Sequence, residues 1–462
     1  MNKQEILDTC NKEEQKLIEI VYSTKQDHLF QYWHELTPEQ RKTLLNDLAT
    51  IDFSLLTMQP SEKKEKKTFT SAPLITPSQN SEEENKIAFK KGEELLHAGK
   101  IALFTVSGGQ GTRLGYNGPK GCYPVTPVKE KSLLQIFAEK ILALQKKYDT
   151  VLHWYIMTSE STDIITKQFF HKYHFFGLSP SSVHFIKQGI LPTLSEKRKL
   201  ILKDKHKVLM HPNGHGGALK IMINILPQIQ KKEYIFYFQI DDVLTNIADP
   251  LFLGYHALSH SDMSTKSVEK INPEEKVGIV GTVNGKYSVI EYSDLSDEEK
   301  KMRDTEGKLV YRAGNIAVHI FSISFLKTLK TKKLPFHDTY KKINSDGKEK
   351  EVLQFETFIF DTLFFAQKSI ILLVDRAKEF APLKNKEGEK SLMTVCQAQN
   401  NFFGSWLEKA GVKVPRSEKG DVLCNLEISP LFALTQEDFI KKFNQKNIKL
   451  QAGHNYYFGG EQ

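Results

Sequence analysis

The pattern of apolar and polar positions changes along the chain at Ile101. Up to about residue 56, apolar residues recur at helix-like intervals among Lys and Glu, and Thr37-Pro38 has the form of an N-cap followed by a first-turn proline. From Ile101 onward the chain contains short, nearly continuous apolar runs, namely IALFTVS, VLHWYIMTS, VHFIKQ, YIFYFQI and SIILLVD. The pattern predicts N-terminal helices followed by buried β-strands.

Amphipathic stretches separate these apolar runs, as in SLLQIFAEKILALQKKY and GGALKIMINILPQIQ. Buried strands alternating with helices predict an α/β fold with a mixed, mainly parallel sheet and helices on both faces. Three further runs, VGIVGTV, YSVIEYS and KLVYRAG, predict an antiparallel addition to that sheet. In an open parallel sheet, ligands bind outside the carboxyl ends of the strands, so the loops there are the places to look for chemistry.

The same patterns predict four regions along the chain. We expect an N-terminal helical region over residues 1–60, a connecting segment over 61–90, a catalytic domain over 91–394 and a small C-terminal domain over 395–462. The connecting segment contains SEKKEKK with several Ser and Pro, which is typical of an exposed linker. In the C-terminal region the pattern predicts one helix, EDFIKKF.

Composition excludes several classes of protein. The 462 residues are 40% apolar and 26% charged, which excludes a disordered or collagen-like chain. The formal charge of +8 is small for this length, so it permits an anionic ligand but does not require nucleic acid. The sequence also lacks the stripe of basic and aromatic residues that is typical of nucleic-acid binding. The four scattered cysteines and the absence of a signal peptide or a long apolar stretch predict a cytoplasmic protein without a membrane partner.

The first predicted strand runs directly into SGGQGTRLGYNGPKG, residues 107–121. Gly108 and Gly109 let backbone N–H groups approach a ligand, while Arg113 and Lys120 supply two cations. The loop is neither a dinucleotide fingerprint, because Leu114 replaces the third glycine, nor a P-loop. A tight turn would explain the glycines but not the cations, so the loop indicates binding of a nucleoside triphosphate.

This loop resembles the signature SGGQGTRLGxxxPKG of the eukaryotic-type UDP-sugar pyrophosphorylases, and most closely that of the UDP-N-acetylhexosamine pyrophosphorylases. The resemblance continues in the family's order through HWYIMTS, FIKQGILP, QIDDVLTNIADP, VEKINPEEKVGIV, VIEYSDL, AGNIAVH, FETFIFD, EFAPLKN and EISPL, over roughly residues 95–430. It implies a Rossmann-like, GT-A-like nucleotidyltransferase fold. It also implies that UTP and a sugar 1-phosphate, most closely N-acetylglucosamine 1-phosphate, give a UDP-sugar and pyrophosphate.

The resemblance also implies a role for each matched residue. Arg113 and Lys120 would hold the triphosphate, Lys384 would contact the phosphate that joins base and sugar, and Asp241 would bind Mg²⁺, with Mn²⁺ as an alternative. Substrate contacts are implied for Gly108, Gly109, Gln188, Gly214 and His215 at the uridine, for Gly278, Glu291 and Asn315 at the sugar, and for Phe358 and Phe360 at the N-acetyl group. From the residues alone, Gln188 is better explained as a strand-end residue that caps a loop, and the two phenylalanines could equally be core residues in a helix.

Three positions depart from the family pattern. His215 stands where the N-acetylhexosamine branch has Asn, and the Gly-His-Gly string is instead similar to the UDP-glucose branch. Asp242 replaces an Asn, and it either adds a metal ligand or caps the following turn. Arg312 replaces an Asn two places before the glycine of AGN.

Two alternatives to the leading hypothesis therefore stay open. One is the same chemistry on glucose 1-phosphate, which His215 favours. The other is a non-catalytic sensor that binds UDP-sugars, although such a sensor is expected to have lost a phosphate-binding cation or the metal carboxylate. For either enzyme we expect a monomer or a weak homo-oligomer.

Overall fold

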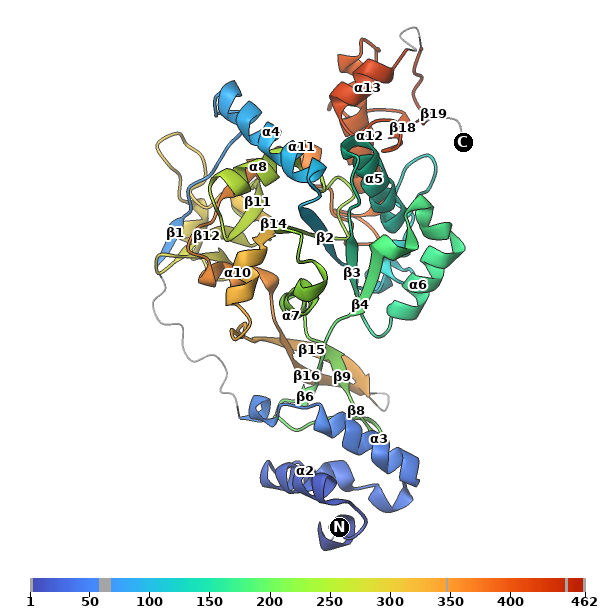
Figure 1. Cartoon of the computed structure of the whole chain (residues 1–462), viewed down its shortest axis with the longest axis vertical. Helices are drawn as coiled ribbons and strands as arrows, with labels where there is room; N and C mark the ends of the chain where they lie inside the picture. Colours follow the sequence, from blue (N-terminus) through green and yellow to red (C-terminus); the bar gives the residue numbers. More distant parts are fainter. Residues whose placement is uncertain (1–2, 58–67, 346–347, 445–447, 460–462) are drawn as a thin grey trace. The chain divides into compact units, whose positions relative to one another are not determined.

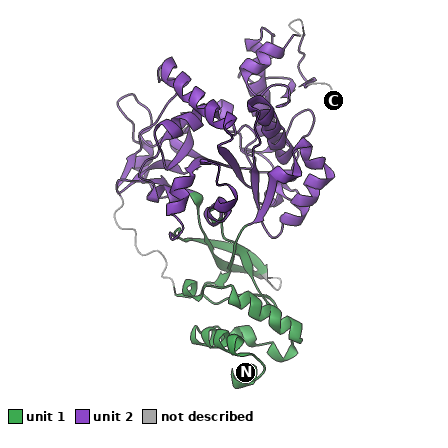
Figure 2. Ribbon diagram, in the orientation of Figure 1, with its two compact units in different colours: residues 1–67, 188–217, 334–359 green, residues 68–187, 218–333, 360–462 purple. Residues whose placement is uncertain are grey.

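The computed structural model describes residues 3–57, 68–345, 348–444 and 448–459 (Figure 1). The chain forms two compact units that are interleaved in sequence (Figure 2). Unit 1 comprises residues 1–67, 188–217 and 334–359, and unit 2 comprises residues 68–187, 218–333 and 360–462. The predicted boundaries of functional domains stay a prediction.

Unit 2 is built on a ten-stranded mixed sheet. β10, β2, β3 and β4 are parallel, and β14 pairs antiparallel with β10 and with β11. The strands are β1 (Phe69–Ser71), β2 (Ile101–Val106), β3 (Trp154–Thr158), β4 (Val183–Lys187), β10 (Tyr234–Gln239), β11 (Met263–Glu269), β12 (Ile279–Val283), β13 (Lys286–Ile290), β14 (Ala313–Ser322) and β17 (Ile371–Val374). The predicted α/β class is confirmed.

The apolar runs become strands because they are buried. Ile101, Leu103 and Phe104 are fully buried in β2, and the one polar side chain among them, Thr105, accepts a hydrogen bond from the indole of Trp154 at 2.7 Å. Burying β-branched and aromatic residues on both faces stabilises a central strand. Each of the five apolar runs is confirmed as a strand of the sheet.

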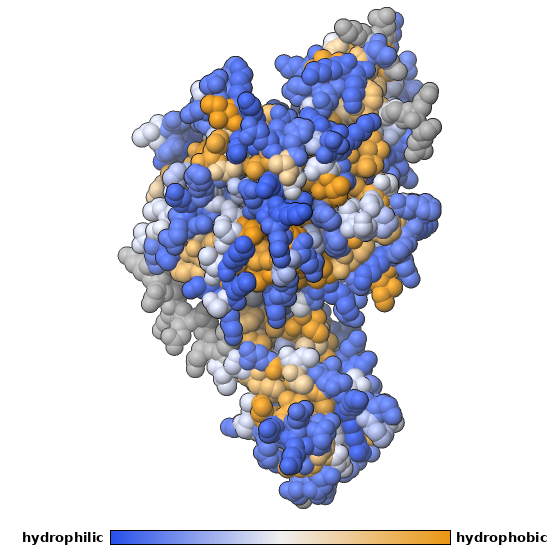
Figure 3. All heavy atoms as spheres, in the orientation of Figure 1, coloured by the Kyte–Doolittle hydropathy of each residue, from blue (hydrophilic) through white to orange (hydrophobic). Residues whose placement is uncertain are grey.

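Helices connect and cover these strands (Figure 1). Those of unit 2 are α4 (Glu82–His97), α5 (Leu133–Tyr148), α6 (Asp163–Lys172), α8 (Pro250–Leu258), α9 (Asp297–Lys301), α10 (Ile323–Thr328), α11 (Arg376–Glu379), α12 (Leu392–Lys409) and α13 (Gln436–Lys442), while α7 (Gly217–Ile225) begins with the last residue of a unit 1 segment. Residues of α4, α5 and α8 share one buried core with β2, β3 and β10. On the face of the molecule visible in Figure 3, hydrophilic residues predominate and apolar residues gather in several patches between them.

Two glycines let α4 and α8 approach each other closely. A Cβ at Gly254 would lie 1.6 Å from the carbonyl oxygen of Ala88, and one at Gly92 would lie 1.8 Å from that of Pro250. Real side-chain atoms cannot approach a backbone oxygen so closely. The crossing of α4 and α8 therefore requires glycine at both positions.

Two predictions about secondary structure are wrong in part. Residues 308–312 of KLVYRAG are not a strand, because Arg303 and Leu309 form only an isolated bridge, and only its last two residues, Ala313 and Gly314, belong to the antiparallel strand β14. The C-terminal region contains the long helix α12 in addition to the predicted EDFIKKF helix, α13. The pattern missed α12 because Gln399 and Asn400 are buried, and their side chains bond to backbone groups in place of apolar contacts.

The predicted connecting segment contains regular structure where it is described. β1 pairs with β12, and α4 begins at Glu82. Ile75 exchanges backbone hydrogen bonds of 2.8 Å with Ile371 and Leu373. The part of the segment before residue 68 lies outside the described residues. Among the described residues, no helix is long and apolar enough to cross a membrane.

Unit 1 combines the N-terminal helices with small sheets. Its helices are α1 (Lys3–Leu7), α2 (Lys12–Ser23) and α3 (Pro38–Ala49), and its strands are β5 (Ile190–Pro192), β6 (Leu194–Ser195), β7 (Leu202–Asp204), β8 (Lys207–Val208), β9 (Met210–Pro212), β15 (His337–Ser345) and β16 (Lys348–Glu356). Helices and strands share one apolar core. The predicted cap is confirmed, since the Thr37 hydroxyl accepts from the N–H of Gln40 at 3.3 Å in a capping box. A further pair of parallel strands, β18 (Asn425–Ile428) and β19 (Asn455–Phe458), lies in unit 2.

Gly254→Ala should destabilise the protein strongly, because its methyl group would push α8 away from α4. We expect the free energy of unfolding, measured by urea denaturation, to fall by about 2–3 kcal/mol. Lys90→Ala, on the exposed face of α4, is the control and should change it by less than about 0.5 kcal/mol. Equal effects of the two substitutions would contradict the close approach of the helices.

Candidate active site

The segments that carry the predicted phosphate-binding residues leave the sheet of unit 2 at one edge. β2 and β10 are parallel, and β17 runs in the same direction because it is parallel to β11, which like β10 is antiparallel to β14. The carboxyl ends of the three strands therefore lie at the same edge of the sheet. The glycine loop follows β2, Asp241 follows β10, and residues 375–384 follow β17.

The glycine loop closes on itself as a short hairpin. The N–H of Gly111 donates to the carbonyl of Gly118 at 2.8 Å, and the N–H of Lys120 donates to that of Gly109 at 3.0 Å. The hairpin brings Lys120 back to the end of β2, where it begins a short 3-10 helix. The Cα of Gly109 is open on the side where other residues carry a side chain, since a Cβ there would meet nothing within 4 Å.

Three of the four predicted phosphate and metal residues converge. The ammonium of Lys120 lies 3.5 Å from the Asp241 carboxylate, and the ammonium of Lys384 lies 3.9 Å from the same Oδ2 atom. Lys120 also donates to the carbonyl of Leu383 at 3.3 Å, beside Lys384. Two cations thus face one carboxylate, and the Asp241 side chain alone does not neutralise both of them.

Arg113, the fourth of these residues, lies apart from the cluster. It is exposed in the short helix Thr112–Leu114 of the same loop. Among the described residues it has neither an ion-pair partner nor a hydrogen-bond partner for its guanidinium. An exposed guanidinium of this kind is available to a phosphate.

Asp242 differs from Asp241 in its surroundings. Its Oδ1 accepts hydrogen bonds from the N–H groups of Leu244 at 3.1 Å and Ala381 at 2.9 Å. It is only 5% exposed, and this burial raises its pKa to about 7. These contacts favour the interpretation of Asp242 as a cap of the turn after β10.

The predicted sugar-binding residues Gly278, Glu291 and Asn315 lie together in unit 2. The N–H of Asn315 donates to the carbonyl of Gly278 at 2.8 Å, and a Cβ at Gly278 would lie 3.7 Å from Oε1 of Glu291. Arg312, which stands where the family has Asn, forms an ion pair with Asp304, with 2.9 Å between the charged atoms. Its charge is therefore already partly neutralised within the protein.

The predicted uridine-binding residues outside the glycine loop lie in unit 1. Gly214 has a positive φ of 81°, and a Cβ there would lie 2.6 Å from the carbonyl oxygen of Thr357. Nδ1 of His215 accepts from the N–H of Ile359 at 3.2 Å, and its ring stacks on Phe358 with centroids 5.2 Å apart. Gln188 lies two residues before β5 and Gly214 lies two residues after β9, and these two strands pair antiparallel.

The predicted residues are thus distributed over both units. Gln188, Gly214, His215 and Phe358 belong to unit 1, while Phe360 and the others belong to unit 2. Phe358 precedes the 3-10 helix Ile359–Phe365 and Phe360 is buried within it, so the predicted helix exists for only one of the two phenylalanines. Their contacts with substrate stay predictions.

No group of three or more His, Cys, Asp or Glu side chains able to hold a metal ion occurs in the described part of the chain. The donor set present at the strand end is the Asp241 carboxylate, whose side chain is 15% exposed. Mg²⁺ is commonly bound by one or two carboxylates together with substrate phosphates and water. The residues present therefore fit a magnesium ion that arrives with a nucleotide.

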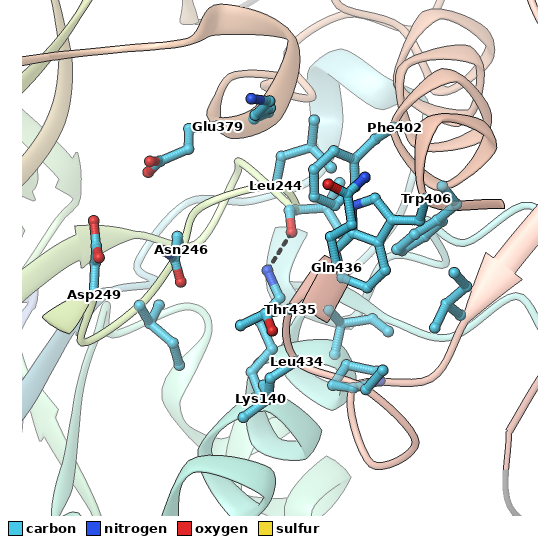
Figure 4. A pocket seen from close by; sticks show the side chains of 18 of the residues that line it. Lys140, Leu244, Asn246, Asp249, Glu379, Phe402, Trp406, Leu434, Thr435 and Gln436 are labelled. Atoms are coloured by element: carbon cyan, nitrogen blue, oxygen red, sulfur yellow. Dashed lines mark hydrogen bonds between the residues drawn. The ribbon is translucent and has the colours of Figure 1, made fainter. Parts of the chain in front are cut away.

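A cavity of about 340 Å³ lies elsewhere in unit 2 (Figure 4). Its wall includes Val243 and Leu244, which follow Asp242, and Glu379, which precedes the Lys384 segment. None of the predicted site residues lines it. No motif in the sequence indicates the charged groups that line this cavity, because Lys140 lies in a stretch that predicts an ordinary amphipathic helix and Glu379 in one that looks like a surface turn.

The chain is similar to known proteins over most of its length. A family model described as UTP--glucose-1-phosphate uridylyltransferase matches residues 52–443. The chain is 33% identical to the UDP-N-acetylglucosamine pyrophosphorylase of Saccharomyces cerevisiae over 84% of this chain and 90% of that protein. It is 32% identical to the human UDP-N-acetylhexosamine pyrophosphorylase-like protein 1 over 89% of this chain and 91% of that protein.

A solved structure shares the fold. The uridine diphosphate N-acetylglucosamine pyrophosphorylase from Trypanosoma brucei superimposes with a TM-score of 0.77 at 23% identity, covering 94% of this chain and 95% of that one. These findings confirm the resemblance and the fold class predicted from the sequence.

Arg113→Ala should cut the rate of pyrophosphate release from UTP by about 10²–10³-fold, because a charge-stabilising donor would be lost. The fold should stay intact, since Arg113 is exposed. Steady-state kinetics and circular dichroism measure the two effects. Lys330→Ala, another exposed cation, is the control, and a normal rate in Arg113→Ala would contradict the role of the loop.

Proposed function

Since this chain belongs to the UTP--glucose-1-phosphate uridylyltransferase family, we propose that it forms UDP-N-acetylglucosamine and pyrophosphate from UTP and N-acetylglucosamine 1-phosphate. One observation supports this reaction above the others: the ammonium groups of Lys120 and Lys384 face the single carboxylate of Asp241 at 3.5 and 3.9 Å. The three residues come from segments far apart in the sequence. Their meeting at the carboxyl edge of the sheet is what a transfer between two phosphate-bearing substrates requires.

The reaction joins two anions. An oxygen of the sugar phosphate attacks the α-phosphorus of UTP, a new P–O bond forms, and the bond to the departing pyrophosphate breaks on the opposite side. The nucleophile is already ionised, so no general base is needed. The protein's contribution is to align two anions that repel each other and to stabilise negative charge on the phosphoryl oxygens.

The cations of this chain divide that work by position. Lys384 comes from the segment after β17 and would neutralise the α-phosphate, where both P–O bonds change. Lys120 and Arg113 lie on the glycine loop and would stabilise the leaving pyrophosphate. The uneven charge, two ammonium groups against one carboxylate, favours a ligand with several negative charges.

Asp241 would hold a Mg²⁺ ion together with phosphate oxygens, and the ion would neutralise charge on the α-phosphate. Asp242 would fix the backbone next to Asp241, since its Oδ1 accepts hydrogen bonds from two backbone N–H groups.

The relatives support N-acetylglucosamine 1-phosphate as the sugar substrate. The yeast relative is named for UDP-N-acetylglucosamine and the human relative for UDP-N-acetylhexosamine. His215 favours glucose 1-phosphate as the alternative, because this residue stands where the N-acetylhexosamine branch has Asn. In the structure His215 accepts from the N–H of Ile359 and stacks on Phe358, so it links its loop to the segment that contains these two residues.

Pyrophosphate release across a panel of sugar 1-phosphates with UTP and Mg²⁺ tests the proposal. We expect kcat/KM for N-acetylglucosamine 1-phosphate to exceed that for glucose 1-phosphate at least about tenfold, a difference of roughly 1.4 kcal/mol. The reverse order would assign the glucose reaction. Tight binding of UDP-sugars without any pyrophosphate release would instead indicate a non-catalytic sensor.

We also propose that the protein acts as a monomer or weak homo-oligomer in the cytoplasm. All four cysteines are free thiols, which suits a reducing compartment.

Asp241→Asn should raise the Mg²⁺ concentration needed for half-maximal activity by at least about tenfold, the loss typical even of outer-shell partners. A Mg²⁺ titration at saturating UTP measures the shift. Asp242→Asn is the matched comparison and should leave the midpoint nearly unchanged. A shift in Asp242→Asn alone would move the metal role to that residue.

Asn315→Ala should raise the KM for the sugar phosphate by about tenfold, the effect of one lost hydrogen bond. The KM for UTP should change by less than about twofold, because Asn315 lies with Gly278 and Glu291 and not with the lysine cluster. Initial rates at varied concentrations of each substrate separate the two constants. An equal rise in both would reject Asn315 as a sugar contact.

A further inference from the structure

Lys266 is a fully buried lysine in the middle of β11. Its ammonium lies 2.7 Å from Oδ2 of Asp249 and 2.5 Å from Oε2 of Glu379. Burial alone would lower the pKa of Lys266, but the two carboxylates raise it above its usual value. A buried charge of this kind is costly unless it is paired, so the three side chains form one interdependent unit.

Each carboxylate belongs to a segment that leads to the predicted site. Asp249 ends the loop that begins with Asp241 and Asp242, and it caps α8 by accepting from the N–H of Leu251 at 3.0 Å. Glu379 is the last residue of α11, five residues before Lys384. Figure 4 shows Asp249 and Glu379 on the same side of the cavity, where they come from different segments.

The segment after Glu379 pairs directly with the end of β10. The N–H of Ala381 donates to Asp242 at 2.9 Å, and the N–H of Leu383 donates to the backbone carbonyl of Asp241 at 2.8 Å. The carbonyl of Leu383 in turn accepts from Lys120 at 3.3 Å. Hydrogen bonds of residues 381–384 therefore connect Lys120 and Asp241 to the segment that carries Lys384.

A second lysine, Lys140, also holds the loop that follows Asp242. Lys140 of α5 donates to the carbonyls of Val243 at 2.7 Å and Thr245 at 2.9 Å. It fixes the loop after Asp242 but makes no ion pair with Glu379 or Asp249. Lys266 differs from it in pairing with one carboxylate on each of the two segments.

We propose that Lys266 is a positioning residue of the transferase reaction, which sets the place of Lys384 relative to Asp241 by holding Glu379 and Asp249 together. This inference rests on the proposed function, since it assigns a role within that reaction. Lys266 itself does not contact the site residues. It acts through the path Glu379, Ala381, Leu383 and Lys384.

A double-mutant cycle between Lys266 and Lys384 tests this role. Lys266→Met keeps the length of the side chain and removes its charge, and Lys384→Ala removes the group that it is proposed to position. We expect Lys266→Met to lower kcat at least about tenfold in the wild-type background and by less than about threefold in the Lys384→Ala background. A purely structural role would give the same fold-change in both backgrounds, and that result would overturn the proposal.

Lys131→Met is the matched control. Lys131 is a largely buried lysine of unit 2, with its side chain 10% exposed, and it is paired with Glu139 at 2.7 Å, outside the path to Lys384. It should lower the melting temperature by an amount comparable to Lys266→Met while changing kcat by less than about threefold. A loss of kcat in Lys131→Met as large as that in Lys266→Met would show that any buried lysine has this effect, and would overturn the proposal.

Glu379→Gln provides a second variant that keeps the volume of the side chain if Lys266→Met does not fold. It should show the same dependence on the Lys384 background, and an equal effect in both backgrounds would again overturn the proposal. Pyrophosphate release by the wild-type protein serves as the separate test of the function. If the wild type releases none, the proposed function fails, and the same cycle is measured on the Kd for UTP with Mg²⁺, where an additive result overturns the positioning role.

Discussion

The geometry of the candidate site depends on one electrostatic arrangement, the two ammonium groups of Lys120 and Lys384 around the carboxylate of Asp241. One negative charge cannot neutralise two positive ones, and the separations of 3.5 and 3.9 Å are longer than those of a closely hydrogen-bonded ion pair. Lys384 is the most accessible of the three groups, with its side chain 47% exposed, so water or a polyanion can reach its charge. A bound phosphate would supply the negative charge that the two ammonium groups lack, so binding of the phosphate would also neutralise them.

The rest of unit 2 keeps these three groups in place. Parallel strands bring Asp241 and the glycine loop to one edge, and the segment from Ala381 to Lys384 joins them through backbone hydrogen bonds. The ion pairs of Lys266 are buried and join two segments that lead to this junction. Buried charges are poor sources of stability, because desolvation offsets much of their attraction, but they restrict the arrangements that the surrounding segments can adopt. Here the restricted segments are those that carry the reacting groups.

Much of the fold and of the site could be predicted from the sequence. The five apolar runs are strands, and Thr37 caps its helix as its sequence predicts. The strand predicted at KLVYRAG and the missed helix α12 show the limit of this approach. In both cases polar side chains bond within the protein, as Arg312 does with Asp304 and Gln399 does with Val125, and a pattern of apolar positions does not register such bonds.

The sequence by itself determined the chemistry of the groups: the glycine loop with its cations, the carboxylate at a strand end, and the family to which they belong. These features are local, since residue type and spacing within a few positions specify them. Only the tertiary structure decided that Lys384 meets Asp241, that Asp242 caps a turn, and that Lys266 joins Asp249 to Glu379. Such contacts join residues far apart in the chain, and their energies depend on burial and on the packing of separate segments, which no single stretch of sequence contains.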